Sequence, residues 1–105
     1  AVTPTGELYP CHQFVGNKEY LMGDIWKGVT NLDIQSKFKR CNAYSRKECD
    51  DCWARLYCSG GCAANAYNAT GDVNGVYAYG CDLFKKRIEC ELVIMLKVDE
   101  QTSEE

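Results

Sequence analysis

The chain carries eight cysteines in 105 residues, and four of them fall within the fourteen residues CDDCWARLYCSGGC at positions 49–62. A chain of this length buries roughly 60–68% of the surface that its unfolded state exposes, so its apolar core alone gives a modest stability. Small domains of this kind commonly depend on disulfides or a bound metal for the rest. What the thiols hold therefore constrains the fold more than any other feature. The eight are Cys11, Cys41, Cys49, Cys52, Cys58, Cys62, Cys81 and Cys90.

Three kinds of bonding fit this set of thiols. An even number permits a disulfide framework, although cysteines two or three residues apart bridge to each other with difficulty. A zinc site would use the four cysteines of positions 49–62, but only five residues separate its two pairs, where zinc ribbons commonly have about 12–20. An iron–sulfur cluster is wider than one ion and often adds a distant cysteine, here Cys81, to a compact run of ligands. The spacing favours the cluster and leaves the other two alternatives open.

Two glycines, Gly60 and Gly61, directly precede Cys62. Without side chains they would let the backbone approach an inorganic core and direct amides at its sulfides, although a plain tight turn uses glycine in the same way. Cys90 stands among apolar residues, where we expect a buried free thiol. Basic residues near the cysteine run would offset an anionic cluster or form a solvated face: Lys37, Lys39, Arg40, Arg46, Lys47 and Arg55.

The N-terminal segment predicts a β-hairpin. Residues 7–14 and 19–22 are strand-like runs, and residues 15–18, VGNK, join them with a glycine and an asparagine that tolerate a turn. Alternation along the first run would place Cys11 and His12 on opposite faces.

Helices are predicted for the remainder of the chain, which gives a small α+β fold. A short helix is expected within residues 31–41, with Asn31 or Asp33 as its N-cap, and a second within residues 63–69. From Asp82 as N-cap, an amphipathic helix of about four turns is expected to end near Val98 and to cover the loops before it. Its apolar stripe consists of Phe84, Ile88, Leu92 and Met95.

The charge pattern argues against two classes of partner. Residues 99–105 carry four acidic residues, and residues 1–98 carry 11 acids against 12 bases, so the body is nearly neutral. Nucleic-acid binding would require an excess of clustered Lys and Arg. No stretch approaches the roughly 20 apolar residues of a membrane span. We therefore expect neither nucleic acid nor a membrane as a partner.

The cysteine run and its surroundings resemble a known family. The pattern Cx2Cx5Cx3C at positions 49–62, with Cys81 after it and the phrases GELYPCHQF and MGDI before it, resembles the SPASM domain. That domain is the C-terminal auxiliary-cluster domain of radical SAM peptide maturases. The similarity extends from about Gly6 to Leu96 and is greatest to the thioether-forming maturases of six-cysteine (SCIFF) peptides.

The resemblance implies two [4Fe-4S] clusters, with cysteine-rich loops and short helices wrapped around them. The last cysteine of the run, Cys62, would turn back to cluster I, which it would share with Cys11 of the hairpin. The ligands of cluster II would be Cys49, Cys52, Cys58 and Cys81.

The chain departs from the family pattern at cluster I. The family commonly has another ligand five residues after the glycine that matches Gly23, but Gly28 stands there. Cys41 is then the best available third ligand, and His12, on the other face of the strand, is a rival candidate for the fourth. Three protein thiolates would leave one open iron, which we expect to take a cysteine thiolate of the substrate.

The chain lacks the Cx3Cx2C triplet of a radical SAM site, because Asn65 stands where a third cysteine would follow Cys62. The resemblance therefore implies an auxiliary domain at residues 1–98, with a frayed acidic tail at 99–105 and no reaction of its own. Its partners would be an upstream radical SAM barrel that binds S-adenosylmethionine, a cysteine-rich precursor peptide, and a flavodoxin or ferredoxin as reductant, all in the cytoplasm. The alternative is a zinc- or disulfide-stabilised interaction domain without a redox role.

Overall fold

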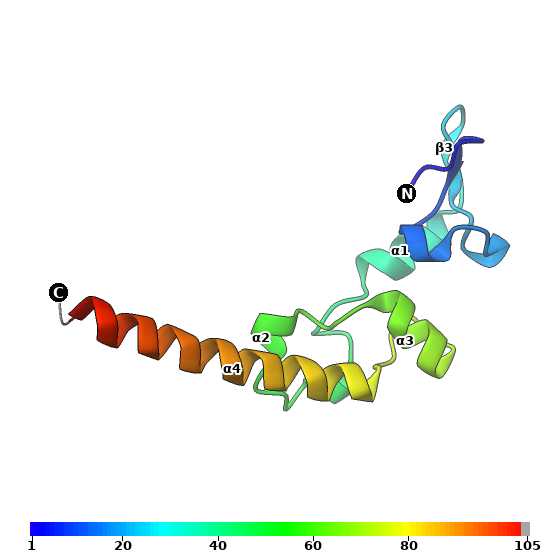
Figure 1. The fold of residues 1–105 in the computed structure, drawn as a ribbon. Coiled ribbons are helices and arrows are strands. Elements are labelled where there is room, and N and C mark those ends of the chain that lie inside the picture. Colours follow the sequence, from blue (N-terminus) through cyan, green and yellow to red (C-terminus); the bar gives the residue numbers. More distant parts are fainter. Residues whose placement is uncertain (104–105) are drawn as a thin grey trace.

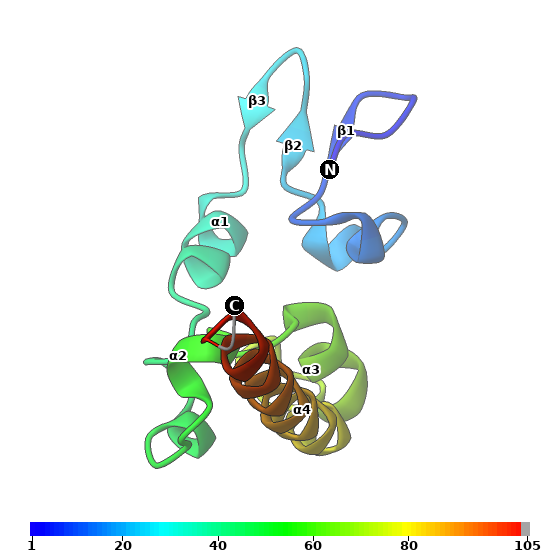
Figure 2. The same cartoon turned by 60° about the vertical axis from the view of Figure 1, so that its left-hand side comes forward.

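The computed structural model describes residues 1–103 and begins with a small antiparallel sheet at one end of the molecule (Figure 1). The strands lie in the order β1-β2-β3, and Figure 2 shows them on the far side of α1 from α3 and α4. Their bounds are β1 Glu7–Leu8, β2 Gly23–Asp24 and β3 Gly28–Val29.

The hairpin expected from residues 7–14 and 19–22 is wrong. The first run is a strand only at β1, and after Pro10 the chain forms two 3-10 turns, η1 (His12–Phe14) and η2 (Lys18–Tyr20). Proline lacks the amide that would continue the ladder, which fits an end of β1 before this point. His12 therefore stands on a turn, and the strand alternation expected for it does not apply.

The hairpin of the structure joins β2 to β3. Asp24 shapes its turn, because its Oδ1 accepts hydrogen bonds from the amides of Trp26 at 2.9 Å and Lys27 at 2.8 Å. Gly23 is required here, because a Cβ at this position would overlap the carbonyl oxygen of Gly28 across the ladder. β1 pairs with β2, on the side of this hairpin away from β3. A longer segment, which contains η1 and η2, connects β1 to β2.

Two of the predicted helices are confirmed. The side chain of Asn31 caps the first by accepting a hydrogen bond from the amide of Ile34 at 3.2 Å, which satisfies one of the free amides of the first turn. The second lies where expected and ends at Gly71 in the left-handed conformation. Two shorter helical turns stand between them. The bounds are α1 Leu32–Lys39, η3 Lys47–Cys49, α2 Arg55–Cys58 and α3 Ala63–Thr70.

An aromatic cluster joins the sheet end of the molecule to α1 and α3. Phe14 and Tyr20, both buried, lie with ring centroids 4.5 Å apart. Phe38 of α1 packs edge-on against Phe14 at 5.3 Å, and Tyr67 of α3 approaches Tyr20 at 5.1 Å. Each such pair contributes about 0.5–1.5 kcal/mol beyond the area that it buries, so this cluster fixes α3 to the N-terminal segment.

The C-terminal helix, α4 (Ala78–Ser103), is longer than expected at both ends. It begins before Asp82, which is therefore no N-cap, and it continues past Val98; Glu104 and Glu105 lie outside the described residues. Ile88 is buried, whereas the distal half extends away from the rest of the molecule (Figure 1). The sequence predicts that the helix covers the loops that precede it, and only the first half of α4 does so. The exposed apolar residues of the second half include Leu92, Val93, Ile94, Met95 and Leu96.

The α+β class is confirmed by the three-stranded antiparallel sheet and the helices that follow it. None of the helices within residues 1–103 combines the length and the apolar character that a membrane crossing requires.

Candidate functional site

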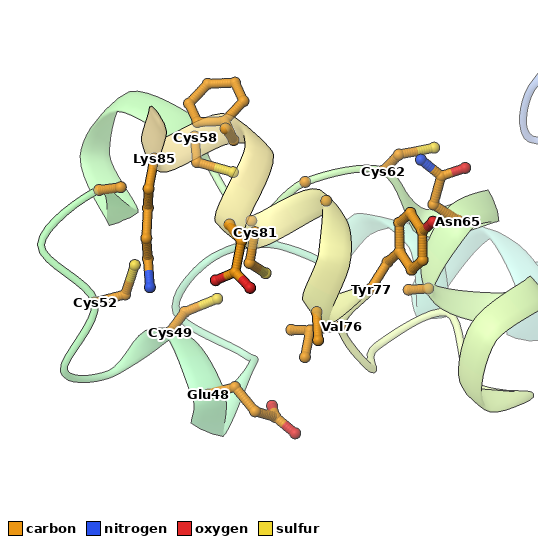
Figure 3. A pocket seen from close by; sticks show the side chains of 18 of the residues that line it. Glu48, Cys49, Cys52, Cys58, Cys62, Asn65, Val76, Tyr77, Cys81 and Lys85 are labelled. Carbon is orange, nitrogen blue, oxygen red and sulfur yellow. The ribbon is translucent and has the colours of Figure 1, made fainter. Parts of the chain in front are cut away.

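Five cysteines line one cavity of about 490 Å³ beside the first turns of α4, and four of them direct their thiols towards a shared space (Figure 3). Three come from the cysteine run and its short helices, and the fourth comes from α4. The cavity is therefore closed by segments about twenty residues apart in the sequence. These four are Cys49, Cys52, Cys58 and Cys81, whose sulfur atoms Figure 3 shows arranged around a shared space, and the fifth cysteine of the lining is Cys62.

Local hydrogen bonding places these cysteines. The amide of Cys52 donates to the carbonyl oxygen of Cys49 at 3.2 Å, which makes their two-residue gap a single tight turn. Cys58 ends α2, where its amide donates to Ala54 at 2.8 Å. Cys81 stands in the first turn of α4, so the direction of that helix determines where its thiol enters the cavity.

The thiols influence one another electrostatically. Burial raises the pKa of the Cys49 thiol, with Arg46 opposing and the other cavity thiols adding to the increase. Burial also raises the pKa of Cys81, to which the neighbouring thiol of Cys58 contributes. Four thiolates in this space would repel one another, and a bound metal or cluster would relieve that repulsion.

Two cationic side chains, Arg55 and Lys85, also line the cavity. Arg55 is held in place because its guanidinium lies 5.1 Å from the ring centroid of Tyr44. Lys85 opposes the rise in the pKa of Cys81. Sequence reasoning missed Lys85, although a residue four positions after Cys81 on a helix lies on the same face and could have been found.

The Gly60–Gly61 pair belongs to a bend of three residues with positive φ: 60° at Ser59, 102° at Gly60 and 75° at Gly61. A Cβ at Gly60 would overlap the guanidinium of Arg46 and lie 2.8 Å from the amide nitrogen of Ala43. Both glycines line the cavity, but the close approach that requires Gly60 is to other parts of the chain. The bend separates Cys58 from Cys62.

Cys62 also lines the cavity, but its sulfur does not join the other four. Figure 3 shows its sulfur directed away from those of Cys49, Cys58 and Cys81. It is exposed at the start of α3, where Gln13 Nε2 donates to its sulfur at 3.7 Å. The thiol set expected for zinc, which includes Cys62, is therefore not brought together. The contact with Gln13 instead directs Cys62 towards the N-terminal segment.

The other candidate ligands have separate surroundings. Cys11 and Cys41 are half-buried and both pack against the aromatic core. Cys41 donates to the carbonyl oxygen of Val73 at 3.0 Å and accepts from Arg46 at 2.9 Å. His12 is exposed, and so is Cys90, which corrects the burial expected for that thiol.

All eight cysteines, which lie within residues 1–103, are free thiols. In this described part of the chain, no three side chains of His, Cys, Asp or Glu lie close enough together to hold a single metal ion. No protein-family model matches the chain, and no curated protein is significantly similar to it.

Proposed function

We propose that the cysteine-lined cavity holds a [4Fe-4S] cluster and that the chain is the auxiliary domain of a radical SAM peptide maturase that forms thioether crosslinks. One observation carries the proposal: Cys81, distant in the sequence, joins the first three cysteines of the run, while Cys62 turns away. A ligand set made of a compact run and one distant cysteine is typical of iron–sulfur proteins.

The donors suit that group chemically. Thiolates are the preferred ligands of iron–sulfur clusters, and the cavity is lined by five cysteines, four of them with sulfurs directed towards its space, and by no histidine. A single zinc ion, with Zn–S bonds of about 2.3 Å, would draw its sulfurs to within about 3.8 Å of one another. A wider inorganic core suits four thiols around a cavity of about 490 Å³ better than one ion does. When bound, the cluster would supply one-electron chemistry.

The residues of this chain would hold the group and balance its charge. Four thiolates carry four negative charges, and the lining of the cavity adds the cations of Arg55 and Lys85 beside the carboxylates of Glu48 and Asp82. Ala54, Ala66 and Ala78 line the cavity with small apolar side chains, which leave room for a bulky group. Such surroundings influence the reduction potential of a cluster.

A second set completes the proposal. Cys11, Cys41 and Cys62 would hold cluster I with three protein thiolates, leaving its fourth ligand to the cysteine-rich precursor peptide. The contact of Cys62 with Gln13, next to Cys11 and His12, supports this return towards the N-terminal segment. The upstream radical SAM barrel, a flavodoxin or ferredoxin reductant, and a cytoplasmic location remain parts of the same proposal.

Anaerobic purification with iron, sulfide and zinc analysis tests this function. We expect a brown protein with about eight iron and eight sulfide per chain, from two four-iron clusters. Cys81→Ser should remove about half of the iron, whereas Cys90→Ser, on the same helix but exposed, should remove none. A colourless protein with stoichiometric zinc, or with no metal, would refute the proposal and favour the structural alternative.

A further inference from the structure

Arg46 is the only charged side chain that is buried within residues 1–103, with 2% of its surface exposed. Its Nε donates to the carbonyl oxygen of Gly75 at 2.9 Å, and its Nη2 donates to Val73 at 3.0 Å and to the sulfur of Cys41 at 2.9 Å. The ion pairs among the described residues do not include Arg46. The guanidinium is thus hydrogen-bonded through Nε and Nη2, and no carboxylate forms an ion pair with it.

A buried cation without an anion is costly. The penalty for burying one charge is several kcal/mol even after relaxation, and neutral hydrogen-bond acceptors offset it only in part. Arginine cannot avoid this cost by losing its proton, because its guanidinium stays protonated in proteins. A position of this kind calls for negative charge nearby.

The groups nearest to Arg46 that can become negatively charged are cysteine thiols. Its guanidinium contacts Cys41 directly, and its charge acts on the thiol of Cys49, where it favours the thiolate. Gly60, which lines the cavity, packs against Nη1. Arg46 therefore lies behind the wall of the four-thiol cavity and contacts a candidate ligand of the other cluster.

We propose that Arg46 is the buried counter-charge of the cluster in this cavity and the positioning residue that holds the Cys41 sulfur against the Val73–Gly75 loop. The inference rests on the proposed function for its first half only. Its second half concerns contacts within the chain itself.

A fixed cation beside a cluster stabilises the reduced form, which carries one more negative charge, relative to the oxidised form. The solvated side chains of the cavity rim are screened by water, whereas Arg46 is not. Removing its charge should therefore lower the reduction potential. Replacing it by lysine keeps the charge but loses the planar fork that binds two carbonyls and a sulfur together.

The experiment compares the wild-type chain with Arg46→Gln, Arg46→Lys and the exposed control Arg87→Gln. Iron and sulfide analysis of the wild type comes first. Where iron is bound, anaerobic titration with dithionite gives the ratio of reduced to oxidised cluster at fixed potential. We expect this ratio to fall about tenfold in Arg46→Gln, which corresponds to about 59 mV for one electron. Arg46→Lys and Arg87→Gln should stay near the wild type.

Each outcome decides one part of the inference. A potential unchanged in Arg46→Gln, or lowered as far in Arg46→Lys, would overturn the counter-charge while leaving the proposed function intact. Should Arg46→Gln fail to fold, Arg46→Lys alone decides, because the proposal requires it to keep the potential. Absence of iron from the wild type would refute the proposed function and the counter-charge together.

If the wild type contains no iron, alkylation of the purified chain still tests whether Arg46 positions the Cys41 sulfur. Mass spectrometry of iodoacetamide-treated protein would give the rate at Cys41 relative to exposed Cys62. We expect the relative rate to rise about tenfold in Arg46→Lys, which keeps a cation near the sulfur but no longer holds it in place, and to stay unchanged in Arg87→Gln. Equal rates in all four proteins would overturn this half too.

Discussion

Replacing Gly60 with alanine should destabilise the protein much more than the same change at Gly61. Both residues have positive φ, 102° and 75°, in the same bend. A Cβ at Gly61 would meet nothing within 4 Å, whereas one at Gly60 would overlap the Arg46 guanidinium and lie 2.8 Å from Ala43 N. The pair therefore separates the cost of the backbone conformation from the cost of the packing.

The magnitudes follow from these two contributions. A left-handed conformation costs a non-glycine residue about 1–2 kcal/mol, which is the whole effect expected for Gly61→Ala. Overpacking a buried site adds about 1–3 kcal/mol, so Gly60→Ala should lower the free energy of unfolding by roughly 2–5 kcal/mol. Neither the backbone of Ala43 nor a guanidinium with three hydrogen bonds can move aside easily.

Anaerobic urea unfolding of the purified protein, followed by circular dichroism, measures both variants. Adding Arg46→Gln to each provides a thermodynamic cycle, in which part of the excess cost at Gly60 should disappear because the overlapping group is gone. Equal losses of stability in Gly60→Ala and Gly61→Ala would refute the packing of Gly60 against Arg46.

Three further predictions concern the core, a helix cap and the thiols. Phe14→Ala should cost about 3–5 kcal/mol of unfolding free energy because it removes the centre of the aromatic cluster, while exposed Val15→Ala should cost little; equal effects would contradict the cluster. Asn31→Ala should cost about 0.5–2 kcal/mol by urea unfolding, and an unchanged midpoint would argue against the cap. The pKa values of the Cys49 and Cys81 thiols are raised in the folded state, so these thiols ionise at a lower pH in the unfolded chain than in the folded one. The metal-free chain should therefore lose stability as the pH rises from about 8.5, where unfolded thiols ionise, through the pKa values of the folded state. Thermal melts should show this slope, and Cys49→Ser with Cys81→Ser should flatten it.

Much of the helical structure could be predicted from local signals. Asn31 begins α1 as its side chain suggests, and the alanine-rich segment 63–70 forms α3. The hairpin could not be placed, because Pro10 ends β1 and Asn17 caps η2 by accepting a hydrogen bond from the amide of Glu19. The strand with which β1 pairs is determined by a tertiary contact, and the local sequence pattern carries no information about such contacts.

The candidate site, too, could be predicted from the sequence only in part. The run of cysteines and its distant member could be found from spacing, and the structure gathers Cys49, Cys52, Cys58 and Cys81 at one cavity; their role as ligands stays a prediction. The burial of Arg46 could not be foreseen, because its neighbours in the sequence, Ser45 and Lys47, are exposed and polar. Its position depends on carbonyl groups almost thirty residues further along the chain.

The unbroken course of α4 has a mechanical consequence. The helix is buried at Ile88, while Cys81 lies near its start and Ser103 at its end. At 1.5 Å per residue, the arm from Ile88 to Cys81 is about 10 Å and the arm to Ser103 about 22 Å. A tilt about Ile88 would thus move the far end roughly twice as far as the thiol. Of the two arms of α4, the shorter one therefore carries the thiol of Cys81 that faces the cavity.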